Sequence, residues 1–262
     1  MTLGIVWRDR SSNIHFFSDS RVNLGTASSD FGIKVVRIPF NIYGPSDEHN
    51  QAPLITCGDI GMTFAGATVL PLMVREALAE ILFRVQAMPG YSQYDMDAIS
   101  DLLFNSFDLI ARDADFVTNS NIDACIVFSG YCTTKQTYRA FLMDVTRQSR
   151  PAKREILAAP LDIEIVGTGK AAASALIPAS ATQRQIVSAL QAVIDDPSVP
   201  TVGGNIQYGS FRGSSFQPFG IIKTDAAGVH YWRGPLDLNA PPFEPGTGLV
   251  PNFPYLDLDS LP

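Results

Sequence analysis

The sequence begins MTLGIVWRDRSSNIHFFSDSRVNLGTASSDFGIK (residues 1–34), and the fold prediction starts from this stretch. Apolar side chains alternate from Leu3 to Trp7, which is typical of a strand buried on at least one face. The polar run 8–13 indicates a tight connection, and the apolar run 14–17 indicates a second strand. The two strands are therefore predicted to form a hairpin. Asp19 would then lie at the end of the second strand, close to where the first strand begins.

A third strand is predicted over residues 32–38, where Lys34 and Arg37 interrupt an apolar run. Burying a lysine in such a run is costly unless an opposite charge neutralises it. Asp19 is the obvious partner for Lys34. The plainest interpretation of this pair is a structural ion pair at a sheet edge; the other is an electropositive pocket that supports chemistry.

Thr2 directly follows Met1, so removal of Met1 would leave a free amine and a hydroxyl on one residue. A threonine hydroxyl is a weak nucleophile near neutral pH, and an N-terminal amine can serve as its base. A cation such as Lys34 beside that amine would lower the amine's pKa, because it disfavours the protonated form. The same charge would stabilise a developing alkoxide. Retention of Met1 would block this chemistry.

The pattern of Thr2, Asp19-Ser20-Arg21 and Lys34 resembles the proteasome β-subunit. It equally resembles the bacterial ATP-dependent peptidase subunit, another member of the N-terminal nucleophile (Ntn) hydrolase superfamily. The resemblance implies an α+β fold, a four-layer αββα sandwich of two mainly antiparallel sheets flanked by helices. It also implies Thr2 as the nucleophile, with Asp19 and Lys34 beside it. Arg21 matches the Asp-x-Arg element, and we expect it to be a structural pairing residue.

Two later segments complete the resemblance. The segment Thr63-Phe64-Ala65-Gly66-Ala67 is similar to the one whose glycine N–H forms the oxyanion hole, which implies that role for Gly66. Gly167-Thr168-Gly169 is similar to a Gly-Ser-Gly turn whose hydroxyl lies near the nucleophile, which implies a supporting role for Thr168. Without the resemblance, Gly66 would be read as a turn residue and Thr168 as a helix cap.

Besides Thr168, which stands where the family usually has serine, the sequence departs from the family pattern in two places. Val199 and Val202 stand where some proteasome subunits have Asp and Ser, so the outer hydrogen-bonding network is expected to be absent. Residues 39–59 form a longer connection than expected, predicted to be a loop with one short strand at 54–57.

The remaining elements are predicted from periodicity and turn signals. Helices are expected at about 68–87, 94–113, 169–177 and 182–194, the last with a capping box of Thr182 and Gln185. Further strands are expected at 61–65, 122–129, 138–145, 153–158, 163–166, 203–207, 216–223 and 228–232. Residues 1–235 are predicted to form one domain. The proline-rich tail 236–262 is predicted to be extended, and either to cover a neighbouring surface or to be disordered.

Composition narrows the functional classes. The chain has 262 residues and a net charge of -7, which argues against a general nucleic-acid or anionic-membrane partner. Its three cysteines lack metal-ligand spacing, and no apolar run is long enough to cross a bilayer. The three histidines are scattered, and no Gly-x-Ser-x-Gly motif accompanies them. We therefore expect a cytoplasmic protein with reduced thiols and no metal or organic cofactor.

The function expected from these residues is that of an N-terminal threonine hydrolase. It would cleave peptide bonds through an acyl-enzyme intermediate and, by the resemblance, work as a homo-oligomeric ring. A regulatory ATPase partner stays unknown. Two alternatives are open: an amidase of the same superfamily acting on a non-peptide amide, and a non-catalytic ring-forming or interaction protein that retains the fold.

Overall fold

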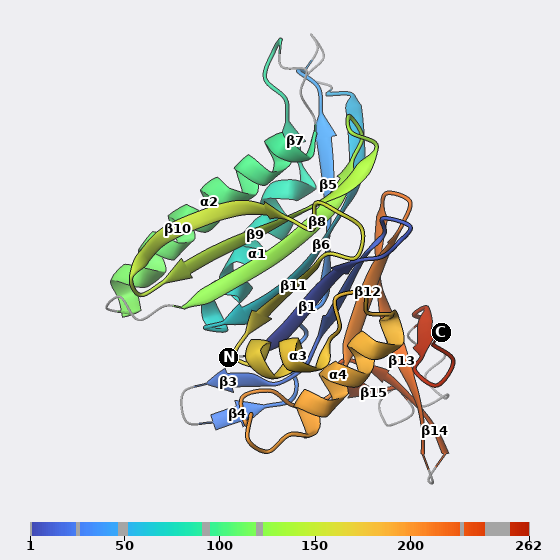
Figure 1. Cartoon of the computed structure of the whole chain (residues 1–262). Coiled ribbons are helices and arrows are strands. Elements are labelled where there is room, and N and C mark those ends of the chain that lie inside the picture. The colour runs from blue at the N-terminus through green and yellow to red at the C-terminus, as the bar shows by residue number, and fades with distance from the viewer. Residues whose placement is uncertain are drawn as a thin grey trace.

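The computed structural model describes residues 2–24, 27–46, 52–90, 95–118, 123–225, 228–238 and 252–261. Within these ranges the chain forms two large sheets, one two-stranded sheet and four helices (Figure 1). The mixed α+β class predicted from the sequence is confirmed.

The eight-stranded sheet carries the N-terminal strand near one edge. Its order is β11-β1-β2-β12-β13-β14-β15, and β16 also pairs with β13. The predicted hairpin of β1 and β2 is confirmed, with Gly4 opposite Ser18. The bounds are β1 (Leu3–Arg8), β2 (Ile14–Ser18), β11 (Ile163–Gly167), β12 (Gln207–Arg212), β13 (Ser215–Asp225), β14 (Gly228–Arg233), β15 (Leu236–Asp237) and β16 (Tyr255–Asp257).

The six-stranded sheet has the order β10-β9-β8-β6-β5-β7. Its strands are β5 (Val36–Tyr43), β6 (Leu54–Gly66), β7 (Val85–Gln86), β8 (Ala124–Cys132), β9 (Thr137–Thr146) and β10 (Ser149–Ile156). The prediction of a loop over residues 39–59 is wrong, because β5 and β6 form a long antiparallel hairpin across much of it. Pro39 is compatible with this strand: its partner Asp59 donates its N–H to Ser214 instead, so the two residues face each other without backbone hydrogen bonds.

The predicted third strand begins later than expected, at Val36, which leaves Lys34 in the preceding connection. The reason is the side chain of Gln207. Its Oε1 accepts the N–H groups of Lys34 at 2.9 Å and Val35 at 3.3 Å, and these donors are therefore not available to a neighbouring strand. A short hairpin of β3 (Val22–Leu24) and β4 (Ala27–Ser29) was not predicted.

Each of the two large sheets packs against two helices (Figure 1). Helices α1 (Val69–Phe83) and α2 (Met96–Thr118) share a core cluster with the six-stranded sheet. Helices α3 (Lys170–Leu176) and α4 (Gln183–Asp195) share a second cluster with the eight-stranded sheet. The Thr182–Gln185 capping box predicted for α4 is confirmed. A third cluster contains residues of both large sheets, among them Phe16, Val127 and Phe216.

The described part of the tail contacts the eight-stranded sheet. Strand β16 adds to β13 in parallel, with Ile221 opposite Leu256, and Leu261 is 4% exposed. Gly220 leaves room for the Tyr255 ring, because a Cβ there would meet ring atoms at 2.5 Å. The division into a 1–235 domain and a 236–262 tail stays a prediction. In the described part of the chain, no helix is both long and apolar enough to span a membrane.

Candidate active site

Asp19 is the centre of the candidate site. It follows β2 and is fully buried, at 0% exposed. Its Oδ1 accepts hydrogen bonds from Thr2 Oγ1 at 2.5 Å, Leu3 N at 3.0 Å and Lys34 Nζ at 2.7 Å. Its Oδ2 accepts from the backbone N–H groups of Arg21 and Gly203, each at 3.1 Å. Five donors around one carboxylate fix its position.

Lys34 is present beside Asp19, as the sequence predicted, with its side chain 1% exposed. Burial lowers the pKa of Lys34, and the charge and hydrogen bond of Asp19 oppose that effect. The segment that carries Lys34 is fixed by Gln207, whose Nε2 donates to Gly32 O at 2.6 Å and Asp19 O at 3.3 Å. Gln207 was not predicted as a site residue. No local sequence signal marks it, because this wholly buried amide accepts from the Lys34 N–H, which lies 173 residues earlier in the chain.

Arg21, which was expected to be a structural pairing residue, forms an ion pair with Asp30. Its Nε donates to Asp30 Oδ1 at 2.6 Å, and this bond raises the pKa of Arg21. Its Nη1 donates to Pro200 O at 3.1 Å, and Gly203 O accepts the N–H of Arg21 at 3.0 Å. Arg21 therefore holds the loop that supplies one of the Asp19 donors.

Thr168 lies on the rim of the site. Its side chain is exposed, and its Oγ1 is 2.7 Å from Thr201 Oγ1. An outer hydrogen-bonding network was expected to be absent, because Val199 and Val202 stand at its positions. Thr201, which lies between them and was not predicted, supplies a hydroxyl to Thr168. Val202 is instead 1% exposed in the core beneath α3 and α4.

Two glycines allow close backbone contacts at the site, Gly167 against Thr2 and Gly66 against Asp123. Gly167 has φ +97°, and a Cβ there would lie 2.0 Å from Thr2 O and 3.1 Å from the Ala65 Cβ. Gly66 has φ +98°, and a Cβ there would lie 2.2 Å from Asp123 O. Both positions need a residue without a side chain, because the backbone is left-handed and the space is filled.

Gly167→Ala is therefore expected to cost about 2–3 kcal/mol of the free energy of unfolding, from backbone strain and the clash with Thr2 O. Gly213→Ala is the matched control, since Gly213 has φ +59° but a Cβ added there would meet nothing within 4 Å. Urea unfolding of both variants measures the difference. Equal losses in the two variants would contradict the close approach of Gly167 to Thr2.

A pocket of about 490 Å³ opens beside these glycines. Gly66, Gly167 and Thr168 line one part of it, and Cys125 and Asp144 line another. The site residues inferred from the sequence thus converge on two adjoining places: Thr2, Asp19 and Lys34 at the buried carboxylate, and Gly66 and Thr168 at the pocket.

Burial raises the pKa of the Cys125 thiol to about 12. At pH 8 this thiol stays protonated and is a poor nucleophile. We expect iodoacetamide at pH 8 to modify exposed Cys57 first, and Cys125 and buried Cys132 only after denaturation. Peptide mass spectrometry reads out the three sites separately. Rapid labelling of Cys125 in the folded protein would show an accessible, acidic thiol and contradict the prediction.

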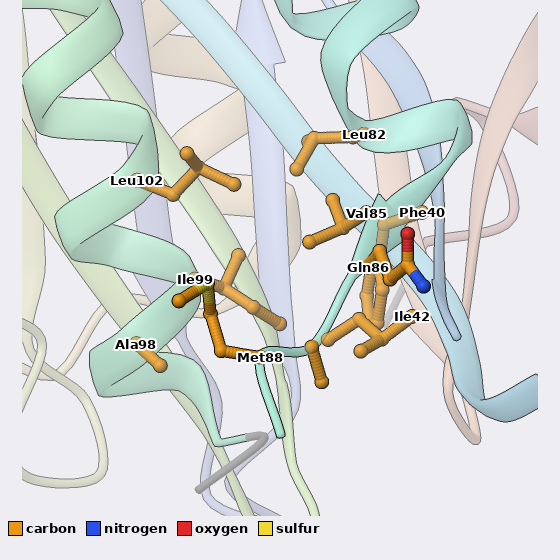
Figure 2. A pocket seen from close by; sticks show the side chains of 10 residues that line it. Phe40, Ile42, Leu82, Val85, Gln86, Met88, Ala98, Ile99 and Leu102 are labelled. Atoms are coloured by element: carbon orange, nitrogen blue, oxygen red, sulfur yellow. The ribbon is translucent and has the colours of Figure 1, made fainter. Parts of the chain in front are cut away.

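A second pocket, of about 210 Å³, lies between β5, β7 and the ends of α1 and α2. Figure 2 shows Ile42, Val85 and Leu102 pointing toward one another across it. Of the ten residues that line it, Gln86 alone has a polar side chain, so this pocket holds no nucleophile, acid or base. Within the described ranges, no group of three His, Cys, Asp or Glu side chains could hold a metal ion.

Several solved structures are similar to this chain along most of its length. Anbu (ancestral beta-subunit) from Yersinia bercovieri is 15% identical with a TM-score of 0.54, covering 82% of this chain and 86% of that one. The helical assembly of the Anbu complex from Pseudomonas aeruginosa is 15% identical with a TM-score of 0.54, and the match covers 86% of this chain and 88% of that one. An Anbu (Gly-1) mutant from Hyphomicrobium sp. strain MC1 is 12% identical with a TM-score of 0.50, and the match covers 83% of this chain and 84% of that one.

The chain has the fold of Anbu β-subunits. No protein-family model and no curated protein matches the sequence. At 12–15% identity the likeness shows the fold alone.

These comparisons correct the resemblance drawn from the sequence. The chain was placed in the proteasome β-subunit-like Ntn hydrolases, close to the bacterial proteasome-like peptidase subunits, and that placement is wrong: the similar structures are Anbu proteins. The physical reason lies in how few positions carried the resemblance. Asp19, for example, has a structural task that is sufficient to explain it, since it holds the backbone N–H groups of Leu3, Arg21 and Gly203.

Proposed function

We propose that this chain, once Met1 is removed, is an N-terminal threonine hydrolase that cleaves peptide bonds. The observation that carries the proposal is one shared oxygen. Asp19 Oδ1 accepts from Thr2 Oγ1 at 2.5 Å and from Lys34 Nζ at 2.7 Å, which brings the hydroxyl and the ammonium to the same point. A purely structural ion pair would not need the second residue of the chain to join it.

In the proposed reaction, Thr2 Oγ attacks the carbonyl carbon of the substrate while the Thr2 amine takes the hydroxyl proton. The Gly66 N–H stabilises the oxyanion, and Lys34 stabilises the negative charge developing on Oγ. The C–N bond then breaks, and the amine passes its proton to the leaving nitrogen. Water attacks the resulting ester, giving a proton to the Thr2 amine. Collapse of this second intermediate releases the carboxylic acid, and the proton returns to Oγ.

The neighbours have supporting tasks in this proposal. Asp19 keeps Lys34 oriented and charged against the burial that lowers its pKa. Thr168 and its partner Thr201 position the rim of the pocket. Arg21 holds the loop that contains Gly203 and does not contact the reacting atoms.

The decisive experiment combines intact mass with a covalent probe. A peptide epoxyketone needs both a free amine and a hydroxyl on the same residue to form its adduct. We expect purified protein lacking Met1 to gain one probe mass, mapped by proteolysis to Thr2. Protein that lacks Met1, is folded, and gains no adduct would overturn the proposal.

We further propose that the chain stacks in four layers and associates with copies of itself. The three core clusters support the layers: one under α1 and α2, one under α3 and α4, and one between the sheets. The Pseudomonas aeruginosa structure is described as a helical assembly, which supports self-association here. Light scattering coupled to gel filtration measures the mass in solution, and a monomer at all concentrations would contradict self-association.

A non-catalytic assembly protein is the second candidate. The observation that favours it is the burial of Thr2, which is 3% exposed. Intact mass separates the two candidates, because retention of Met1 in the mature protein leaves no free threonine amine.

A further inference from the structure

We infer that the pocket beside Thr2 takes a basic side chain, lysine or arginine, and that Asp144 is its counter-charge. This inference rests on the proposed function, since it names the substrate class of the same site. Asp144 would be a specificity-determining residue and would not touch the reacting atoms.

The first argument is position. Ala65, Cys125 and Asp144 are directly opposite one another on three neighbouring strands, β6, β8 and β9. Directly opposed residues present their side chains to the same face of a sheet. On these strands Ala65, Val127 and Leu142 belong to the cluster between the two sheets, so the row of Ala65, Cys125 and Asp144 faces that space.

The second argument is distance. A Cβ on Gly167 would lie 2.0 Å from Thr2 O and 3.1 Å from the Ala65 Cβ, so the row begins beneath Thr2. Neighbouring strands are about 4.8 Å apart, which places Asp144 roughly 10 Å from Ala65. A side chain that enters beside Thr2 must cross Cys125 to reach the carboxylate. Lysine and arginine have the long apolar stems with charged ends that such a path requires.

The third argument is charge. Glu164, which also lines the pocket, is neutralised by Arg154 at 2.9 Å and lies 3.8 Å from Lys170. Asp123 is neutralised by Arg147 at 3.2 Å. The Asp144 carboxylate, in contrast, makes no hydrogen bond or ion pair with the parts of the chain that the structure describes. It is the carboxylate in this pocket whose charge is left for a ligand.

The walls between the mouth and Asp144 suit the stem of a basic residue. Leu142, Ile165 and Val166 line the pocket with apolar surface, and Cys125 presents a neutral thiol. An acidic side chain that reached the end of this row would meet Asp144, whereas the two cations that line the pocket, Arg154 and Lys170, both lie beside Glu164. A short apolar side chain would leave that carboxylate unpaired, and therefore gain less from the pocket.

The test uses Met1-free protein and fluorogenic peptide amides that differ only in the residue before the cleaved bond, either arginine or leucine. We expect the wild type to prefer arginine about tenfold in kcat/KM. Asp144→Asn keeps the side-chain shape and should abolish the preference while retaining cleavage of the leucine peptide. Asp123→Asn is the matched control in the same pocket, because Arg147 already neutralises Asp123, and it should retain the preference.

A binding assay keeps the inference separate from catalysis. Thr2→Ala protein is titrated with fluorescein-labelled arginine and leucine peptides, and anisotropy gives the two Kd values. Tighter arginine binding that is lost on adding Asp144→Asn supports the basic pocket even where no peptide is cleaved, and then the proposed hydrolase fails alone. Equal Kd values for the arginine and leucine peptides, or a preference for arginine that persists in Asp144→Asn, overturn the inference whatever the rate of hydrolysis.

Discussion

Asp19→Ala is expected to destabilise the protein by about 3–5 kcal/mol, because it leaves the Lys34 ammonium buried without a counter-charge. The same substitution removes the acceptor for Leu3 N and Gly203 N and one of the two acceptors of Arg21 N, which keeps its bond to Gly203 O. These donors come from β1, from the segment after β2 and from the loop before β12. The loss therefore loosens three separate parts of the chain at one point.

Lys34→Met should cost less than Asp19→Ala. Without Lys34 the carboxylate keeps four hydrogen bonds, whereas without Asp19 the ammonium keeps none that the described residues supply. The double variant should recover part of the loss, since methionine removes the unpaired cation. Asp30→Ala is the control, because the Arg21–Asp30 pair is half exposed and should be worth about 1 kcal/mol or less.

Urea unfolding of the four variants, with the m-value checked for each, measures these free energies. An Asp19→Ala loss no larger than that of Asp30→Ala would show that the buried pair does not hold the site together.

The sequence predicted the elements whose signals are local. The alternation from Leu3 to Trp7 with the polar turn after it was sufficient for the β1–β2 hairpin. The Thr182–Gln185 box was sufficient for the start of α4, because both hydrogen bonds lie within four residues. The β5–β6 hairpin was missed because its register depends on a contact from far along the chain. Asp59 there accepts from Ser215 and Phe216 at the start of β13.

The candidate site divides in the same way. The Asp19–Lys34 pair could be inferred because a buried lysine demands a carboxylate, whatever the fold. Gln207 and Thr201 could not be inferred, because their tasks depend on the third dimension. Gln207 is 173 residues from the Lys34 N–H that it accepts, and Thr201 is 33 residues from Thr168. No periodicity connects residues at such separations.

The same distinction explains why the family placement was wrong although the predicted contact between Asp19 and Lys34 is present. A carboxylate that follows one strand and a lysine that precedes another will meet in any fold that brings these strand ends together. The Asp19–Lys34 pair forms because the two strand ends lie close together and because a buried charge is costly without a partner. It does not by itself report the evolutionary family or the chemistry, so the chemistry has to be tested at Thr2 itself.

Thr2→Ala is expected to lower kcat/KM by about 10⁴-fold or more, because it removes the only nucleophile of the proposed mechanism. The variant should still fold. It loses the hydrogen bond from Thr2 Oγ1 to Asp19, worth about 1.5 kcal/mol, while Asp19 keeps its four other donors. Hydrolysis of a peptide amide and urea unfolding, measured on the same preparations, separate the two effects.

Thr2→Ser is the matched variant, since it retains the hydroxyl and changes only the methyl group that restricts χ1. It should keep the hydrogen bond to Asp19 and hydrolyse measurably more slowly than the wild type. A Thr2→Val variant tests the opposite case: it keeps the branched shape, removes the hydroxyl, and should be as inactive as Thr2→Ala. Turnover that persists in Thr2→Ala or Thr2→Val would place the nucleophile elsewhere. In that case the Thr2–Asp19–Lys34 contact would be structural, and the buried hydroxyl would serve to satisfy the carboxylate.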